Sequence, residues 1–379
     1  MNNNTKVDFL YLSEPDMIKA GVKDMAGCVE AMEEMFKLLK VGDFRMGGSN
    51  GFSHGCMVTF PETSSFPNMP IDGPDRRFMA MPAYLGGDFN MAGAKWYGSN
   101  AENRKKGLPR SVLMLTLNDK DTGAPVAHMS ANVLSAYRTG AIPGVGVKYL
   151  AREDSKIVGI VGPGVMAKTA LASFMAVRPA IETVKIKGRS QKSIEDFVKY
   201  VEDEFPTVKN IEVVDDIQSA VKDADVVCLA TSATIGNLDE YPYVKEEWIK
   251  PGAVICCPAA GRFDEDFVLN RARNVTDCLH LYEAWSEEYP YPTFLSIPIP
   301  AVNCMDLIHE GKMKKEQIHD LGDILMGKLP ARRNDEEITI YSVGGMPVED
   351  IAWGTIVYRN ALEKGIGTKL NLWDEPELA

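Results

Sequence analysis

The stretch Lys156-Ile-Val-Gly-Ile-Val-Gly-Pro-Gly-Val-Met-Ala167 decides the fold of this chain. Its first half is a short apolar run rich in valine and isoleucine, which is typical of a buried strand. The run breaks at a Gly-Pro-Gly turn, and the residues from Val165 to Ala176 have the alanine, methionine, leucine and lysine content of a helix. A strand, a glycine turn and a helix in this order form the context in which G-x-G-x-x-G/A indicates dinucleotide binding.

Each small residue of this turn meets a physical requirement of dinucleotide binding. Gly162 permits a tight turn, and Gly164 lets the backbone approach a pyrophosphate with no Cβ in the way. Ala167 allows the helix to pack closely on the strand, and the N–H groups at the helix start face the phosphates. The alternative is a plain structural turn, which any glycine turn after a strand can imitate. The predicted cofactor-binding residues here are Gly162, Pro163, Gly164, Val165 and Met166.

The chain after residue 150 alternates between predicted strands and predicted helices. Helices are expected from Val165, from Ser190 or Ser193 to about Glu204, and over Ile217–Lys222. Strands separated by helices favour a parallel sheet with right-handed crossovers, so we predict an α/β fold with a Rossmann-type doubly wound sheet. The predicted strands are Ile157–Gly162, Thr183–Lys187, Ile211–Val214, Val226–Thr231 and Ala253–Cys257.

The two ends of the chain have a different pattern. About the first 130 residues contain a helical stretch and several strand-like segments joined by loops, which is typical of an α+β unit with an antiparallel sheet. Beyond residue 303 the sequence predicts a helix (Lys315–Met326), a strand (Ile338–Val343) and a last helix (Pro347–Glu363). We expect this C-terminal segment to rejoin the N-terminal unit.

Composition excludes several classes of protein. The net charge of −12 argues against a nucleic-acid-binding surface. No apolar run approaches the ~20 residues of a membrane span, and the first residues lack the basic and apolar regions of a signal peptide. The seven cysteines contain no C-x-x-C pair, and the five histidines have no metal-ligand spacing. We therefore expect a reduced, cytoplasmic protein with no metal site.

The end of the second predicted strand bears on the choice of dinucleotide. In an NAD-binding unit this strand ends near an Asp or Glu that binds the adenosine ribose, but here Gly188-Arg189-Ser190 follows it. A guanidinium and a hydroxyl, with Lys192 close by, suit a ribose 2′-phosphate. The sequence thus favours NADP over NAD, with NAD still possible; the alternative is a solvated basic turn.

Six motifs in a fixed order carry a resemblance to a known family. The chain resembles the ornithine cyclodeaminase/mu-crystallin family, which includes amino-acid dehydrogenases and ketimine reductases. The resemblance implies a homodimer, with a substrate-binding and dimerisation domain from residues 1–137 and 325–379 and an NAD(P)-binding Rossmann domain from residues 138–324. The motifs are Met81-Pro-Ala, Ala94-Lys95-Trp, Asp121-Thr-Gly, Tyr137-Arg138-Thr139-Gly140, Gly162-Pro-Gly164 and Ser342-Val-Gly-Gly-Met-Pro-Val-Glu349-Asp350.

Three basic residues match the substrate site that the resemblance implies. Arg138 matches the carboxylate-binding arginine, whose guanidinium holds a carboxylate in a fixed two-bond geometry. Lys95 matches the active-site lysine, which orients the substrate and, if burial lowers its pKa, shuttles a proton to the substrate nitrogen. Arg45, in glycine-rich surroundings, is a second candidate for the carboxylate. The alternatives are a helix-surface ion pair for Arg138 and a strand-surface lysine for Lys95.

Further residues are candidates for binding the cofactor. By resemblance, Thr139 contacts the phosphates and Ser342 the nicotinamide amide. Thr231 and Ser232 lie at the carboxyl end of a predicted parallel strand, where such sheets bind ligands. The alternative for Thr231 and Ser232 is capping of the following turn.

Two departures from the family pattern bear on the substrate. The ornithine-converting members have an Asp after the strand that corresponds to Ala253–Cys257, whereas here the aligned position is Ala260 or Gly261. Asp264 is a candidate to replace it if the loop is shaped differently. Those members also have a Glu where this chain has Met79. The second ammonium of ornithine would then lack its carboxylates, and an unpaired buried charge is costly.

We therefore predict an NAD(P)H-dependent oxidoreductase that transfers hydride at the α-carbon of an amino or imino acid, of the ketimine reductase or amino-acid dehydrogenase type. The expected partners are a small amino, imino or 2-oxo acid and a second copy of the chain. One alternative is an ornithine cyclodeaminase-type ammonia-lyase that retains its NAD. Another is a mu-crystallin-like protein that binds NADPH and a small ligand with little turnover.

Overall fold

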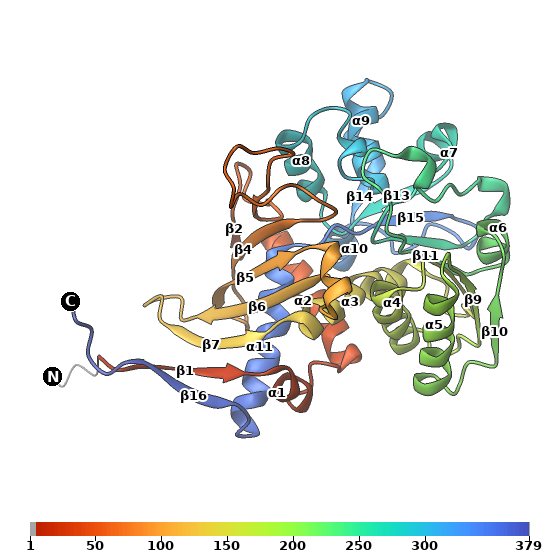
Figure 1. The fold of residues 1–379 in the computed structure, drawn as a ribbon. Helices are drawn as coiled ribbons and strands as arrows, with labels where there is room; N and C mark the ends of the chain where they lie inside the picture. Colours follow the sequence, from red (N-terminus) through yellow and green to blue (C-terminus); the bar gives the residue numbers. More distant parts are fainter. Residues whose placement is uncertain (1–4, 379) are drawn as a thin grey trace. The chain divides into compact units, whose positions relative to one another are not determined.

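The computed structural model describes residues 5–378 and divides the chain into two compact units (Figure 1). The first unit comprises the residues up to Asp24, Val41–Arg138 and the residues from Met346 onward. The second comprises Met25–Lys40 and Thr139–Gly345. Within residues 5–378, no helix has both the length and the apolar character needed to cross a membrane.

The first unit is built on a largely antiparallel sheet. Its strand order is β16-β1-β7-β6-β5-β4-β2, with β3 also paired to β4, and only β1 and β7 run parallel to each other. The long helix α11 packs against β4, β5 and β6. The elements are β1 (Val7–Leu12), α1 (Glu14–Lys19), β2 (Phe44–Met46), β3 (Cys56–Val58), β4 (Arg77–Leu85), β5 (Met91–Ser99), η1 (Ala101–Lys106), β6 (Ser111–Asn118), β7 (Pro125–Ser130), α11 (Pro347–Glu363) and β16 (Thr368–Trp373).

Helix α11 lies close on this sheet. Its first residues favour the start of a helix, and a glycine faces the strands. Pro347 occupies its first turn, where a missing N–H costs nothing. The Glu349 carboxylate accepts the backbone N–H of Met346 at 2.7 Å, which satisfies one of the unpaired donors at the helix start. A Cβ at Gly354 would lie 2.4 Å from the Leu115 side chain on β6, so a larger residue there would have to displace that side chain. The first half of α11 is thereby packed against the strands.

The second unit contains the parallel sheet. Its strand order is β10-β9-β8-β11-β12-β15-β13-β14 and every pairing is parallel. The Rossmann-type α/β prediction is confirmed, and each strand predicted here lies within two residues of its observed bounds at either end. The elements are α2 (Met25–Val41), β8 (Ile157–Val161), α4 (Val165–Val177), β9 (Thr183–Lys187), α5 (Gln191–Glu204), β10 (Asn210–Val213), α6 (Ile217–Val221), β11 (Val226–Leu229), η2 (Leu238–Glu240), η3 (Glu246–Trp248), β12 (Val254–Cys257), α7 (Glu265–Asn270), β13 (Arg273–Thr276), α8 (Leu279–Glu288), η4 (Thr293–Leu295), α9 (Pro300–His309), η5 (Lys315–Gln317), β14 (Ile318–Asp320), α10 (Leu321–Leu325) and β15 (Thr339–Ser342).

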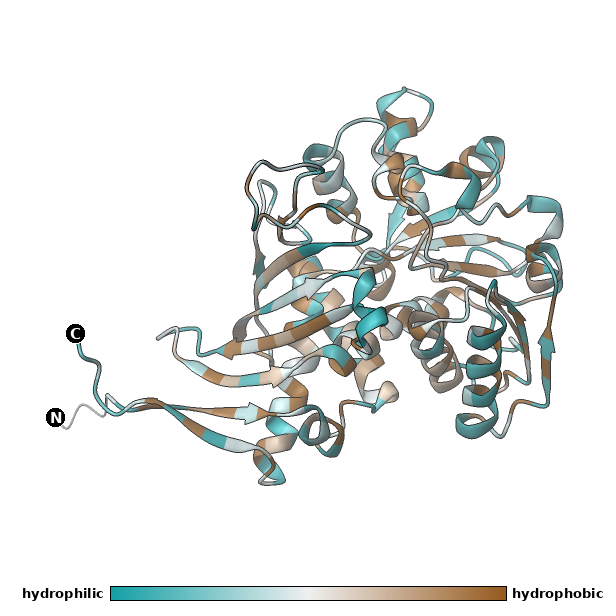
Figure 2. Cartoon of the chain, viewed as in Figure 1, coloured by the Kyte–Doolittle hydropathy of each residue, from teal (hydrophilic) through white to brown (hydrophobic). Residues whose placement is uncertain are grey.

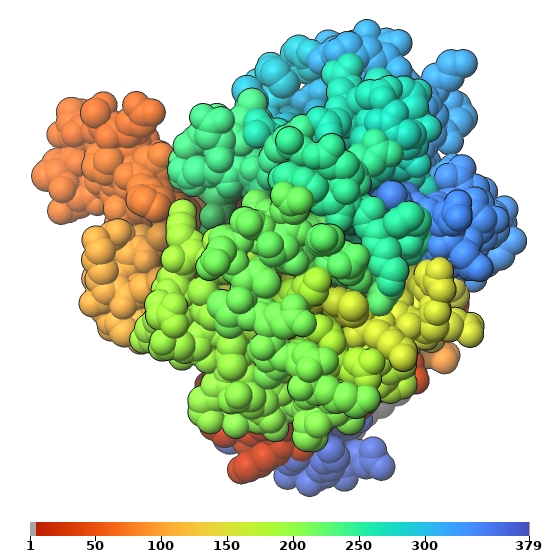
Figure 3. All heavy atoms as spheres, turned by 90° about the vertical axis from the view of Figure 1, so that its right-hand side faces the viewer, coloured from red at the N-terminus to blue at the C-terminus, as the bar shows by residue number. Residues whose placement is uncertain are grey.

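The hydropathy of the elements in the second unit agrees with their burial. The strands β8, β11, β12 and β15 are buried along their lengths, apart from the half-buried Ile157 that begins β8. In Figure 2 the strands of this sheet are mostly brown, whereas α5 shows much teal. Only Phe197 and Val201 of α5 are buried, as expected of a helix that covers one edge of a sheet. Figure 3 shows one face of this unit, much of it as green and cyan surface.

The unit boundaries differ from the predicted domains in two places. Strand β15 pairs with β12 and β13, and residues 325–345 belong to the second unit rather than to the unit formed by the chain ends. Helix α2 also groups with the second unit. Helix α3 (Asn132–Leu150) continues from one unit into the other, since the boundary falls after Arg138.

Candidate active site

Four charged side chains form a buried cluster in the first unit. The Lys95 ammonium donates to Asp350 Oδ2 at 2.7 Å and to Ser135 Oγ at 3.3 Å. Arg138 Nε donates to Asp350 Oδ1 at 3.0 Å, and its Nη1 donates to Glu349 Oε2. Lys95 is 1% exposed and Arg138 5%, while both carboxylates are fully buried. Asp350 therefore bridges the two cations, one with each oxygen.

Three elements place these side chains. Along β5, residues alternate between the two faces of the sheet, so Lys95 and Tyr97 point inward and Trp96 points outward. Arg138 lies in the second turn of α3. Glu349 and Asp350 lie in the first turn of α11, where the helix dipole favours negative charge.

Burial and neighbouring charges tune the protonation of the cluster. Desolvation, with a smaller contribution from the Arg138 guanidinium, lowers the pKa of Lys95 to about 8, although Asp350 and Glu349 oppose this shift. Burial also disfavours the charged form of Arg138, but its two carboxylate partners prevail and raise its pKa. Lys95 can therefore gain and lose a proton near neutral pH, whereas Arg138 stays charged.

The cluster retains capacity to bind a ligand. Among the described residues, Arg138 Nη2 has no hydrogen-bond partner, and the Lys95 ammonium has two hydrogen bonds for its three protons. An unused guanidinium donor beside a proton-exchanging amine suits a carboxylate next to a nitrogen. This pairing of functions is what an α-amino or α-imino acid requires.

Sequence reasoning missed the roles of Glu349 and Asp350, although it quoted them within a motif. A signal was available, because two adjacent carboxylates lie near the start of a predicted helix and are followed directly by the apolar Ile351-Ala-Trp353. Buried acids are almost always paired with a cation. The pattern could have pointed to buried cationic partners but not to which ones.

The two other predicted catalytic residues lie outside these contacts. Arg45 is exposed on β2, where its Nη1 donates to the backbone carbonyls of Gly42 and Phe44. Asp264 belongs to the second unit and precedes α7, where its carboxylate accepts the hydroxyl of Tyr243. Their participation in substrate binding stays a prediction.

The glycine turn of the second unit fits a dinucleotide. Gly162 has φ = 92°, and a Cβ there would lie 2.8 Å from the backbone of Ala230 and Thr231. A Cβ at Gly164 would meet nothing within 4 Å, and no side chain caps the start of α4. The Thr231 hydroxyl is buried and has no hydrogen-bond partner among residues 5–378. A phosphate-bearing ligand would satisfy these groups, so the residues present suit a dinucleotide's pyrophosphate.

The remaining predicted cofactor residues differ in exposure. Arg189, Ser190 and Lys192 are exposed between β9 and the first turn of α5. A Cβ at Gly188 would lie 2.6 Å from Ile194 and 2.9 Å from Pro163, which fixes the path of the chain. Thr139 and Thr231 are partly buried and Ser232 is exposed, while Ser342 is buried and its hydroxyl accepts the backbone N–H of Ala301 at 3.0 Å.

Comparison with known proteins finds relatives along nearly the whole chain. The chain is 29% identical to N-((2S)-2-amino-2-carboxyethyl)-L-glutamate dehydrogenase of Staphylococcus aureus, over 97% of this chain and 99% of the relative. It is also 29% identical to alanine dehydrogenase of Archaeoglobus fulgidus, over 92% of this chain and 94% of the relative.

Solved structures and a family model agree with these relatives. Thermococcus litoralis Δ1-pyrroline-2-carboxylate reductase, in complex with NADH and L-proline, superposes with a TM-score of 0.75 at 28% identity, over 95% of this chain and 99% of that one. An archaeal alanine dehydrogenase dimer with bound NAD gives 0.76 at 27% identity, over 97% and 100%. The model of the ornithine cyclodeaminase/mu-crystallin family matches residues 21–365. This protein therefore belongs to the ornithine cyclodeaminase/mu-crystallin family.

Proposed function

We propose that this protein is an NAD(P)H-dependent oxidoreductase that transfers hydride at the α-carbon of an amino or imino acid. The observation that carries the proposal is the buried Lys95, with a pKa of about 8, beside the permanently charged Arg138. The glycine turn of the second unit supplies the dinucleotide site that hydride transfer needs. Relatives named as amino-acid dehydrogenases and an imino-acid reductase support the same chemistry.

In this proposal the cluster binds the acid and handles its proton. Arg138 holds the α-carboxylate, and Lys95 gives a proton to the substrate nitrogen during reduction and takes it back during oxidation. The nicotinamide supplies or accepts the hydride. The reduction converts an imino acid, NAD(P)H and one proton into an amino acid and NAD(P)+. With a 2-oxo acid and an amine, one water is also released. Asp350 keeps both cations in place.

The first experiment follows NADPH and NADH absorbance with cyclic imino acids and with 2-oxo acids plus amines. Oxidation of the cofactor by at least one imine is the expected result. Ornithine is assayed in parallel for ammonia release without net cofactor consumption, which would instead indicate cyclodeamination. That outcome is disfavoured because the buried Met79 only accepts a hydrogen bond from Tyr97, at 3.1 Å, and offers no carboxylate to a second ammonium. Binding of NADPH with no turnover of any compound would contradict the proposal.

The pH dependence of reduction should report Lys95. Because burial lowers its pKa to about 8, the proton donor is lost as pH rises through that value, so kcat/KM for reduction should fall above about pH 8. The oxidative direction should show the opposite slope. Asp350→Asn removes a carboxylate that raises this pKa and should move the inflection to lower pH. If the inflection in kcat/KM stays at the same pH in both Asp350→Asn and Lys95→Arg, the titrating group is not Lys95.

Cofactor preference is part of the proposal. We infer that Arg189, Ser190 and Lys192 bind the 2′-phosphate of NADP, because they are exposed and no acid stands among them. Arg189→Ala should weaken NADPH binding by roughly 10-fold or more and leave NADH binding almost unchanged, as expected for one charge-assisted contact. Fluorescence titration with both cofactors measures this. Lys199→Ala, on α5 just after this segment but paired with Asp203, is the matched control. Equal losses for the two cofactors would contradict the inference that these residues bind the 2′-phosphate of NADP.

We also infer a homodimer. Phe78 and Trp96 stack on neighbouring strands at 5.8 Å and are 42% and 45% exposed, with Met114 next to Trp96 on β6. A row of exposed apolar side chains along β4, β5 and β6 is typical of an interface. The archaeal alanine dehydrogenase relative is a dimer. Light scattering that gives the mass of a single chain would contradict this inference.

A further inference from the structure

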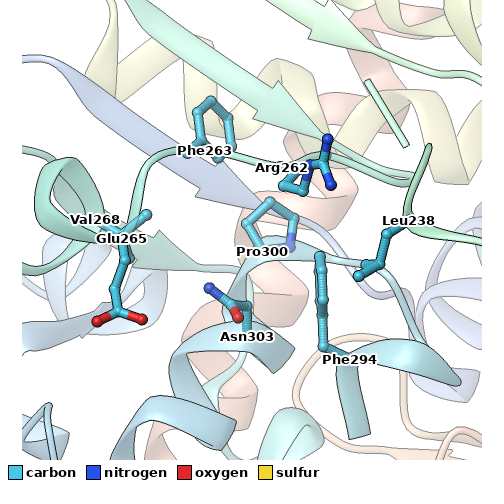
Figure 4. Close-up of a pocket in the computed structure, with 9 residues that line it drawn as sticks. Leu238, Arg262, Phe263, Glu265, Val268, Phe294, Pro300 and Asn303 are labelled. Carbon is cyan, nitrogen blue, oxygen red and sulfur yellow. The ribbon is translucent and has the colours of Figure 1, made fainter. Parts of the chain in front are cut away.

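A cavity of about 240 Å³ lies within the second unit, but its polar side chains do not converge on one point (Figure 4). Arg262 and Asn303 lie on either side of Pro300, and Glu265 lies well away from Arg262. Glu265 is also engaged by Lys312 at 3.0 Å. This cavity therefore presents no set of groups aimed at one ligand. The polar side chains at one edge of the first unit are arranged differently.

Two arginines of the first unit share a single carboxylate. Arg77 begins β4, and its Nη1 donates to Asp75 Oδ1. Arg110 directly precedes β6, and its Nε lies 3.2 Å from Asp75 Oδ2. Within residues 5–378, neither arginine forms another ion pair. Two guanidinium groups on one carboxylate leave one positive charge uncompensated at this place.

Several donors of the arginine pair are unused. Arg77 Nε is buried and has no hydrogen-bond partner among the described residues, and the two Nη atoms of Arg110 also make no hydrogen bond with them. Asp75 Oδ2 already has a second partner, because it accepts the Ser99 hydroxyl at 2.5 Å. The arginine side chains are 29% and 49% exposed, so a ligand can reach them. Guanidinium donors of this kind bind carboxylates well.

The arginine pair lies on the face of the sheet that bears Lys95. In the ladder between β4 and β5, Arg77 is paired with Ser99 and Met81 is paired with Lys95. Side chains alternate along a strand, so residues four positions apart point to the same face. Arg77 therefore shares a face with the buried cluster of the first unit. Four residues of strand separate Ser99 from Lys95, which is about 13 Å.

The side chains between these two places are mostly apolar. Met79, Tyr97 and Leu113 pair with one another across β4, β5 and β6, and Leu113 is only half-buried. The Lys95 ammonium lies 5.8 Å from the centre of the Tyr97 ring, so it is close to this intermediate row. The Tyr97 hydroxyl donates only to Met79 Sδ, which is a weak acceptor. An aliphatic chain would pack against such a row.

We propose that Arg77 and Arg110 bind the distal carboxylate of the substrate, so that the preferred substrate is an imino or 2-oxo acid with a second carboxylate. The α-carboxylate then rests on Arg138, the nitrogen lies beside Lys95 and the aliphatic chain packs against the intermediate row. Because the lysine and arginine side chains both extend into the span of about 13 Å, a ligand of about five carbons closes the gap. The proposal rests on the function proposed above, since it takes the ligand to be the substrate of that reaction.

The test compares two substrates of the same chain length. Reductive amination by NADPH, with methylamine as the amine, is measured with 2-oxoglutarate and with 2-oxopentanoate. The intact protein should favour the dicarboxylate. Arg77→Gln and Arg110→Gln should each lower the dicarboxylate-to-monocarboxylate ratio of kcat/KM by about 10-fold, the scale of one hydrogen bond to a charged group. Arg76→Gln is the matched control and should leave the ratio unchanged, because the Arg76 guanidinium lies over the Phe60 ring and donates to the Ile71 carbonyl.

Two sets of outcomes separate this proposal from the proposed function. If NADPH is oxidised but the ratio is near one, or is unaltered in both Arg77→Gln and Arg110→Gln, the distal carboxylate site is overturned and the function stands. If no 2-oxo acid is reduced, calorimetry with glutarate and with pentanoate, in the presence of NADPH, decides instead. Glutarate binding that is tighter than pentanoate binding and is weakened in Arg110→Gln supports the site. Absence of glutarate binding, or equal binding of the two acids, overturns it.

Discussion

Replacing Lys95 by methionine is expected to lower kcat for imine reduction by about 10²- to 10⁴-fold, the range that a positioned proton donor usually contributes. Methionine is similar in length and apolar, so it fills the buried site on β5 without a charge. Asp350 keeps its hydrogen bond to Arg138 at 3.0 Å, so the cluster does not collapse. Affinity for NADPH should be unchanged, because the predicted cofactor-binding turn lies in the second unit. Single-turnover absorbance kinetics and a cofactor titration measure the two effects separately.

Two further variants sharpen this test. Lys95→Ala leaves space for a small amine, so added methylamine should restore part of the rate if the missing group is a proton donor. Lys105→Met removes an exposed lysine of η1 and should leave kcat unaltered. If Lys95→Met kept its rate, or if rescue failed while NADPH still bound normally, Lys95 would not be the proton donor.

Arg138→Met should cost the protein both stability and substrate affinity. It leaves Glu349 without its guanidinium partner and Asp350 with only Lys95, and breaking a buried ion pair costs about 3–5 kcal/mol. The free energy of unfolding should fall by that amount in urea titrations. KM for the acid should rise as well, because the α-carboxylate loses the positive charge and the unused Nη2 donor of Arg138.

The double variant Arg138→Met/Glu349→Gln separates the two roles of Arg138. Removing the stranded carboxylate should restore a large part of the stability, since the two sites are in direct contact and their effects are not additive. Activity should stay low, because no guanidinium is restored. Recovery of kcat/KM together with stability would mean that Arg138 only supports the fold.

Much of the nucleotide-binding fold could be predicted because its signals are local. The apolar runs of β8 and β11, the alternating pattern of β9 and the turn at Gly162 lie within single short stretches of sequence. Strand alternation and the special backbone of glycine act over a few residues, so reading the sequence alone suffices. The family motifs similarly placed Lys95 and Arg138 as candidates.

What the sequence left open depends on contacts between distant residues. The Lys95–Asp350 pair joins positions 255 residues apart, and the Arg138–Glu349 pair joins positions 211 apart. Nothing local to Glu349 indicates which cation it meets. Likewise, the apolar pattern of β15 would suit either unit, and only its pairing with β12 and β13 assigns it to the parallel sheet.

The position of α11 in the chain has a consequence for biosynthesis. Lys95 and Arg138 are translated long before Glu349 and Asp350, and β1 also pairs with β16 near the far end of the sequence. Until Glu349 and Asp350 have been synthesised, the two cations lack their counter-charges. Until β16 has been synthesised, the sheet of the first unit lacks one of its strands. The strands of the second unit, which end at β15, are all made earlier. A nascent chain is thus expected to acquire its nucleotide fold first and its reactive centre last, so a product stopped before Pro347 is inactive.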